Sequence, residues 1–334
     1  MVPGRRPMEV DKLTGDVTLS LMVVGTDRQR DLDLDGRVSA LRARAVRPTG
    51  DRLAPPPQWR GAPDVPTWRN PTAWLLAAAL ASWAFGWVGH LSGALPASAA
   101  IVANALGAYL GFTVFHESVH RTAHRRRWVN DAMGWLPALM LTFTYPVFRI
   151  CHLQHHAHTN DPELDPDHSV ARRPGWLRPL WLLWTAVNYR RLCRRHRWGS
   201  DGQRRAQLLL DVVLVASLPL ALVAGVADHL LVLYWAPAAL AGAVLFYAFD
   251  YLPHHPHDRT ERFHDTRVQP GGVRHAVLLA QNYHLVHHLW VSVPWFRYRA
   301  VYRELEPQLL AKGIRADLRR PLSRRGRGSA PSTG

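Results

Sequence analysis

The chain has 334 residues, enough for one large domain, and a formal net charge of +16 at neutral pH. A charge of that size is typical of proteins that bind a polyanion, an anionic membrane surface or an acidic partner. Its distribution argues against nucleic acid, because residues 71–115 and 206–249 contain no Lys or Arg, and the two cysteines indicate no disulfide framework.

Residues 1–66 are rich in Arg, Asp, Gly and Pro and show no sustained apolar period. This composition predicts a disordered N-terminal tail and excludes a cleavable signal peptide, since the segment is too charged. We expect a single membrane domain over residues 67–310 and a basic, solvated C-terminal tail over 311–334.

The apolar stretches predict an all-α integral membrane protein with about four transmembrane helices in two hairpins. Residues 72–90 and 97–115 form the first predicted hairpin, and residues 207–227 and 230–249 form the second. A further apolar run, 132–148, contains Pro137 and Pro146, so a re-entrant or interfacial helix is as consistent with it as a full span. The alternative is a soluble all-helical protein with two buried hairpins, but uncharged runs of this length are unusual outside membranes.

The basic residues predict the orientation in the membrane. Residues 1–70, 116–205 and 250–334 together hold all 41 Lys and Arg, whereas the two hairpin turns hold none. The positive-inside rule therefore places both termini and the long middle segment in the cytosol. Every histidine cluster lies in these segments, so we expect a cytosolic metal site below a cytosolic helical cap.

The histidines form three clusters at spacings of three and four residues, which place side chains on one face of a helix. Eight imidazoles exceed the ligands of one zinc ion and indicate two metals. A ninth ligand is expected where the fourth long helix leaves the membrane. The predicted ligands are His116, His120, His152, His155, His156, His254, His284, His287 and His288.

Metal-bound imidazoles usually donate their other N–H to a carboxylate or carbonyl, so supporting residues are expected around the ligands. Segment 160–167 is also consistent with an acidic surface turn, and lone histidines such as His90 are expected to be ordinary surface residues. The candidates for the supporting role are Glu117, His124, His158, Asp161, Asp165, Asp250 and His255.

Spacing does not name the metal, because imidazole suits iron, zinc, copper and nickel. A two-metal hydrolase normally uses carboxylates, whereas these clusters are almost purely histidine. Neutral ligands favour a redox pair that activates dioxygen, and a site at the mouth of a helical bundle can receive a lipid-soluble substrate. The alternative from another class is a membrane protein that binds zinc for structure alone.

The three histidine boxes, their order and their placement around two hairpins resemble the membrane fatty acid desaturase/hydroxylase superfamily over residues 70–310. Segments 152–162, 249–257 and 281–290 are similar to the cyanobacterial-type β-carotene hydroxylases. That resemblance implies two irons held by the nine histidines, O2 as co-substrate, and 3-hydroxylation of the β-ionone ring of carotenoids. Glu117 and Val291 depart from the branch pattern, which keeps fatty acyl-lipid desaturation with the same site as the alternative.

The resemblance also implies that electrons come from a separate donor such as ferredoxin. Segment 269–272 has the Pro-Gly-Gly of a haem-binding motif without its histidine, and the two cysteines cannot hold an iron–sulfur cluster. The arginines of 125–127 and 190–197 are consistent with docking an acidic donor, and equally with contact to anionic lipid headgroups.

Overall fold

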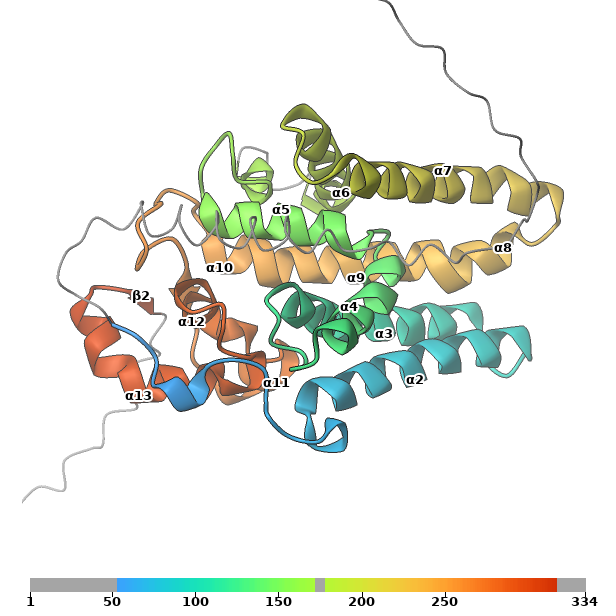
Figure 1. The fold of residues 1–334 in the computed structure, drawn as a ribbon. Helices are drawn as coiled ribbons and strands as arrows, with labels where there is room; N and C mark the ends of the chain where they lie inside the picture. Colours follow the sequence, from blue (N-terminus) through green and yellow to red (C-terminus); the bar gives the residue numbers. More distant parts are fainter. Residues whose placement is uncertain (1–52, 172–177, 317–334) are drawn as a thin grey trace, which may run out of the picture.

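A computed structural model describes residues 53–171 and 178–316, with side chains from residue 185 onward in the second range. These residues are almost entirely helical (Figure 1). Four helical segments are long and apolar enough to cross a membrane, namely Pro71–Leu91, Ala97–Val119, Asp201–Val223 and Ala227–His254. The protein is therefore an all-α integral membrane protein with two helical hairpins, as the sequence predicts.

The first hairpin consists of α2 (Pro71–Leu91) and α3 (Ala97–Val119). The Asn70 side chain accepts a hydrogen bond from the Thr72 N–H at 2.9 Å and begins α2, with Pro71 in the first turn. The two helices pack closely, because a Cβ on Gly107 would lie 2.8 Å from the Ala79 carbonyl oxygen. α3 extends beyond the predicted end at residue 115, so His116 lies in its last turn.

The second hairpin joins α7 (Asp201–Val223) to a long helix made of several parts. Those parts are α8 (Ala227–Leu230), a π turn (Leu231–Trp235), α9 (Ala236–Leu245), a second π turn (Phe246–Tyr251) and α10 (Leu252–His254). Ser200 and Gln203 form a capping box that begins α7 earlier than predicted. Much of α7 exposes apolar side chains, among them Val215 and Val223, which suits a surface against lipid.

A broken helix pair separates the hairpins: α4 (Arg127–Met140) and α5 (Tyr145–Ala157) meet at a bend of 94°. Thr142, in the four-residue break, has a φ of 66°, and Pro146 stands in the first turn of α5. The predicted apolar run 132–148 is thus split between two helices, and α5 turns toward the histidines. α6 (Arg178–Arg195) then leads to α7.

A cap of short elements covers one end of the bundle, opposite the two hairpin turns (Figure 1). It comprises α11 (Gly272–Val277), a 3-10 turn (Gln281–Tyr283), α12 (His284–Leu289), a second such turn (Trp295–Arg297) and α13 (Tyr298–Ala311). Strand β1 (Arg267–Val268) pairs in parallel with β2 (Arg315–Ala316) and links the two ends of this cap. Leu285, Tyr298 and Leu309 are fully or almost fully buried in its core.

The segment before α2 packs on this cap. It contains two 3-10 turns, Pro57–Trp59 and Thr67–Arg69, and Leu53 and Trp59 contact the cap core. Trp59 Nε1 donates to Glu304 of α13 at 2.6 Å. Residues 1–52 of the predicted N-terminal tail and 317–334 of the predicted C-terminal tail lie outside the described residues.

The close contact at Gly107 predicts a clear effect on stability. Gly107→Ala should lower the midpoint of thermal unfolding of the detergent-solubilised protein, because overpacking between helices costs about 1–3 kcal/mol. Gly242→Ala is the matched control, since a Cβ there would meet no atom within 4 Å. Equal unfolding midpoints for the two variants would contradict close packing of α2 on α3.

Candidate metal centre

Four elements carry the predicted ligands to one place beneath the cap. His116 lies in the last turn of α3 and His120 at its end, and His254 ends α10. The second histidine box, His152, His155 and His156, lies on α5, and the third, His284, His287 and His288, lies on α12. All nine predicted histidines meet there, in two groups whose candidate ligand atoms lie within 4.8 Å of one another. The first group is His116, His120, His152, His156 and His287, and the second is His155, His254, His284 and His288.

Within each group the imidazoles face one another through Nε2. In the first group these atoms are 2.9 Å apart for His120 and His152 and 3.1 Å apart for His116 and His287. In the second, His254 and His284 are 3.2 Å apart. Two nitrogens bound to one metal at about 2.1 Å lie about 3.0 Å apart in an octahedron and about 3.4 Å apart in a tetrahedron. The spacing in both groups therefore fits the edges of two coordination polyhedra.

The outward nitrogen of several of these rings is held by a neighbour, which fixes the tautomer. His254 Nδ1 lies 3.3 Å from the carbonyl oxygen of Asp265, which can only accept, so Nδ1 carries the proton and Nε2 is bare. His155 Nδ1 lies 2.8 Å from an Asp165 carboxylate oxygen and has the same tautomer. Bare Nε2 atoms facing one another cannot hydrogen bond, whereas each can donate its lone pair to a metal ion.

A chain of two hydrogen bonds supports His287. The Tyr298 hydroxyl donates to Glu117 at 3.4 Å, so its oxygen is available to accept from His287 Nδ1 at 3.0 Å. Burial, and next the charge of Glu117, raises the pKa of Tyr298 well above its usual value, so the hydroxyl keeps its proton. Glu117 also accepts from Thr122 and from the Trp295 N–H, which fixes the carboxylate.

Burial keeps the cap histidines neutral. Desolvation lowers the pKa of His284, His287 and His288 well below the ordinary value, and the neighbouring imidazoles lower it further. A neutral imidazole is the form that binds a metal. The donor set, its spacing and its protonation state therefore fit a di-metal site.

A cavity of about 480 Å³ reaches this site from the side of α6, α7 and α9. His116, His152, His155 and His284 line one end of it, so both histidine groups face the cavity. Its walls are largely apolar and aromatic and include Phe112, Phe148, Phe249, Leu214 and Leu245. An apolar group fits such a space, because most of the lining is apolar.

The predicted supporting residues take different places. Glu117 lies 3.6 Å from His116 Nδ1 and accepts from the Tyr298 hydroxyl. Asp250 lines the cavity. Asp161 accepts hydrogen bonds from two backbone N–H groups in its own turn. His124 contacts Thr67 and the Arg126 N–H. The exposed His255 lies beside Tyr251. His158 ends α5 and, with His124 and His255, belongs to neither histidine group.

Several contacts were not predicted from the sequence. Asp167 lies 3.2 Å from His155 and accepts from Tyr189, Thr159 lies 3.4 Å from His288, and Tyr298 supports His287. Burial raises the pKa of Asp167 to about 6. The repeated acidic residues of 161–167 were a usable signal for Asp167, whereas Tyr298 and Thr159 come from ordinary-looking helix and loop sequence.

Residues 92–318 match the sequence model of the fatty acid desaturase family. Relatives include a zeaxanthin 4-ketolase of Chlamydomonas reinhardtii (29% identical over 55% of this chain and 39% of the relative) and an sn-1 oleoyl-lipid 12-desaturase of Arthrospira platensis (24%, covering 60% and 66%). A fatty acid conjugase of Calendula officinalis is 25% identical over 61% of this chain and 66% of its own length. The chain thus matches less than two thirds of each of these relatives.

The two histidine groups predict separate losses of metal. His287→Ala and His120→Ala remove a nitrogen from the first group, and His155→Ala and His254→Ala from the second. We expect each variant to fall from about two metals per chain toward one, because an ion that loses one of its imidazoles is held less tightly and is lost during purification. Elemental analysis of the purified protein measures this number.

His90→Ala is the matched control, since His90 contacts His229 at the hairpin turns, far from the cap. It should keep the full metal content. A ligand variant that retains both metals and full activity would remove that histidine from the set.

The support of His287 by Tyr298 predicts a weaker effect. Tyr298→Phe should lower metal affinity about 10–100-fold, the usual consequence of losing an outer hydrogen bond to a ligand. Tyr302→Phe is the control, because its hydroxyl on the same helix bonds to Glu306 instead. Competition with a chelator measures both, and equal affinities in the two variants would argue against a role for Tyr298.

Proposed function

Because the chain belongs to the fatty acid desaturase family, we propose that it is a non-haem di-iron, O2-dependent membrane oxygenase that hydroxylates the β-ionone ring of carotenoids. The observation that carries this proposal is the apolar cavity that ends at both histidine groups. It is suited to present a C–H bond of a hydrocarbon to a redox-active site. In this proposal all nine histidines are iron ligands.

The residues of the chain bind the metals, orient the metal-binding rings and line the substrate cavity. Two irons, when bound, would supply dioxygen activation and C–H oxidation, chemistry that no side chain provides by itself. The imidazoles hold the metals, and Asp165, Tyr298 and the Asp265 carbonyl orient three of the rings. Phe112, Phe148 and Phe249 exclude water from the cavity and direct the substrate toward the histidines.

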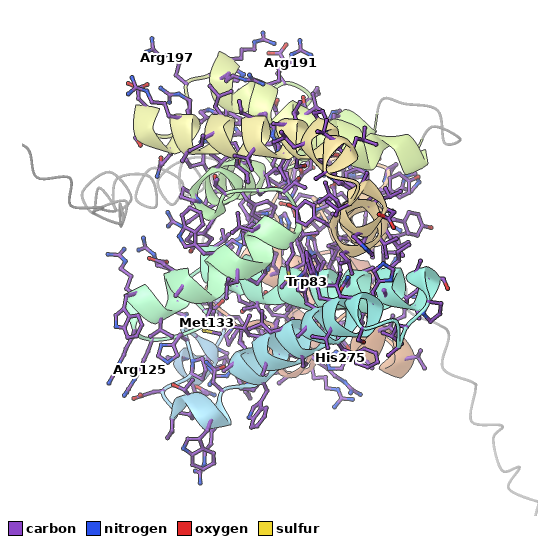
Figure 2. All side chains as sticks on the ribbon, turned by 90° about the vertical axis from the view of Figure 1, so that its right-hand side faces the viewer. Trp83, Arg125, Met133, Arg191, Arg197 and His275 are labelled. Carbon is purple, nitrogen blue, oxygen red and sulfur yellow. The ribbon has the colours of Figure 1, made fainter. Side chains whose placement is uncertain are left out.

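Hydroxylation inserts one oxygen atom of O2 into a C–H bond and releases the other as water, which consumes two electrons and two protons. We propose that a separate acidic donor such as ferredoxin supplies the electrons. Arg191 and Arg197 project from the outer surface beside α6 (Figure 2), where a basic surface would speed the encounter. Anionic lipid headgroups would compete with the electron donor for contact with these arginines.

The carotenoid ring is proposed on two grounds. The segments around the histidine boxes resemble β-carotene hydroxylases, which act at the 3-position, and one relative carries the name zeaxanthin 4-ketolase. Fatty acyl-lipid desaturation is the second candidate, and the 12-desaturase and conjugase relatives favour it because their similarity covers a larger share of both chains. Both reactions would use the same metal site.

Orientation and domain limits complete the proposal. We place both termini and the metal site in the cytosol, since the basic segments flank the cap end of the bundle and the hairpin turns hold no Lys or Arg. We propose a membrane domain over residues 67–310 with tails over 1–66 and 311–334, and within these tails Leu53, Trp59 and strand β2 contact the cap.

Expression in a β-carotene-producing bacterium tests the proposed reaction. We expect new mono- or dihydroxylated carotenoid by chromatography and mass spectrometry, and none from His287→Ala. Acyl chains should stay unchanged. Unaltered pigment together with newly unsaturated acyl chains would move the substrate to lipids and keep the di-metal site.

A further inference from the structure

Two polar side chains at the histidine end of the cavity have no hydrogen-bond partner within residues 53–171 and 178–316. Gln281 is only 2% exposed, and neither its amide oxygen nor its amide nitrogen is bonded. Both carboxylate oxygens of Asp250 are buried and unbonded as well. Both residues line the cavity. Leaving a buried polar group unpaired costs about 1–3 kcal/mol, so a ligand that pairs with both is favoured.

Both residues are next to ligands of the second histidine group. Asp250 precedes His254 by four residues, and Gln281 precedes His284 by three. His284 itself lines the same cavity. A group that contacts Asp250 and Gln281 therefore lies close to the place of oxidation.

The backbone holds Gln281 in a strained setting. Leu279 and Ala280, which come directly before it, have φ values of 47° and 65°, in the left-handed region that such residues rarely adopt. The Ala280 N–H donates to the His275 carbonyl at 2.9 Å, and Gln281 N–H donates to Leu278 at 2.9 Å. Strain of this kind persists where the surrounding structure imposes it, and it clusters at functional sites.

Asp250 is positioned by the π turn Phe246–Tyr251. π turns are rare and occur often at functional sites, because the extra residue in the turn redirects side chains. Pro253 follows and donates no N–H to the helix, which favours a widened turn at this point. The same turn carries Phe249 and Phe246 into the cavity wall.

Some of the other polar groups of the lining are engaged, whereas Nδ1 of His116 and of His284 lacks a hydrogen-bond partner among the described residues. Asp167 accepts from Tyr189, and Arg190 pairs with Asp211 at 2.7 Å. Trp235 Nε1 also lacks a partner in the described part of the chain, but it precedes Asp250 by 15 residues. Along a helix this is about 20 Å, so Trp235 faces the far end of the cavity.

We infer that Asp250 and Gln281 bind a hydroxyl group on the substrate ring, so that the preferred substrate is a carotenoid whose ring already carries a hydroxyl at a carbon other than the one that is oxidised. A hydroxyl donates to the Asp250 carboxylate and accepts from the Gln281 amide, which satisfies both residues. A ring ketone can only accept, and therefore pairs with the Gln281 amide alone. This inference rests on the proposed carotenoid substrate and refines it.

Binding measured with the full chain in lipid nanodiscs tests the inference, with quenching of tryptophan fluorescence as the readout. Three pigments separate the contributions of the two hydrogen bonds, because zeaxanthin has a hydroxyl on each ring, canthaxanthin has a ketone, and β-carotene has neither. We expect affinity to fall in that order, by about tenfold for each hydrogen bond lost.

The variants should change the affinities for the three pigments to different extents. Asp250→Leu should weaken zeaxanthin about tenfold and leave canthaxanthin unchanged, whereas Gln281→Met should weaken both oxygenated pigments. Asp250→Asn, which can still bond to a hydroxyl, should restore the preference for zeaxanthin. Val223→Ala, an exposed position at the end of α7 outside the cavity lining, should alter none of the ratios. Metal content and unfolding midpoint confirm that each variant is folded.

The outcomes distinguish the two proposals. Equal affinity for β-carotene and zeaxanthin, or an equal loss for all pigments in Asp250→Leu and Gln281→Met, would overturn the hydroxyl site and leave the carotenoid ring in place. Binding of an oleoyl lipid with no pigment bound would overturn the carotenoid proposal and this inference with it.

Discussion

Eight of the nine imidazoles at the metal centre are buried, and the bonding of their ring nitrogens organises the end of the bundle. Some outward nitrogens bond to protein acceptors, such as the Asp165 carboxylate and the Asp265 carbonyl, and the inward nitrogens face one another. The cap exists to close this arrangement. Its helix α12 supplies three ligands and α13 supplies the Tyr298 support, while α5 and the two hairpins supply the remaining ligands.

The two histidine groups are unequal, and the difference has chemical meaning. One group has five imidazoles and the other has four, with Asp250 on the same helix as one of the four. A metal with fewer protein ligands keeps more positions for exogenous ligands. The carboxylates Asp165 and Asp167 also lie beside the smaller group through His155, so negative charge is concentrated on that side.

The sequence was sufficient for features that depend on local periodicity. The two hairpins follow from uncharged apolar runs, and the convergence within each box follows from spacings of three and four on helices α3, α5 and α12. Features that depend on long-range packing were out of reach. Tyr298 reaches His287 only because α13 folds back on α12, and Gln281 enters the cavity only because Leu279 and Ala280 adopt left-handed backbone. The two prolines of this region indicated a break between α4 and α5, but the sequence did not predict the size of the bend, which is 94°.

The pairing of β1 with β2 has a consequence for the dynamics of the cap. These strands join residue 267 to residue 315, and β1 begins two residues after Asp265, whose carbonyl holds His254. The segment between the strands carries α11, α12 and α13. A closed loop of this kind tends to exchange its amide protons as one cooperative unit, since opening any part breaks the strand pair. Exchange of a bound metal with solution would then proceed at the opening rate of the whole loop rather than of any single ligand.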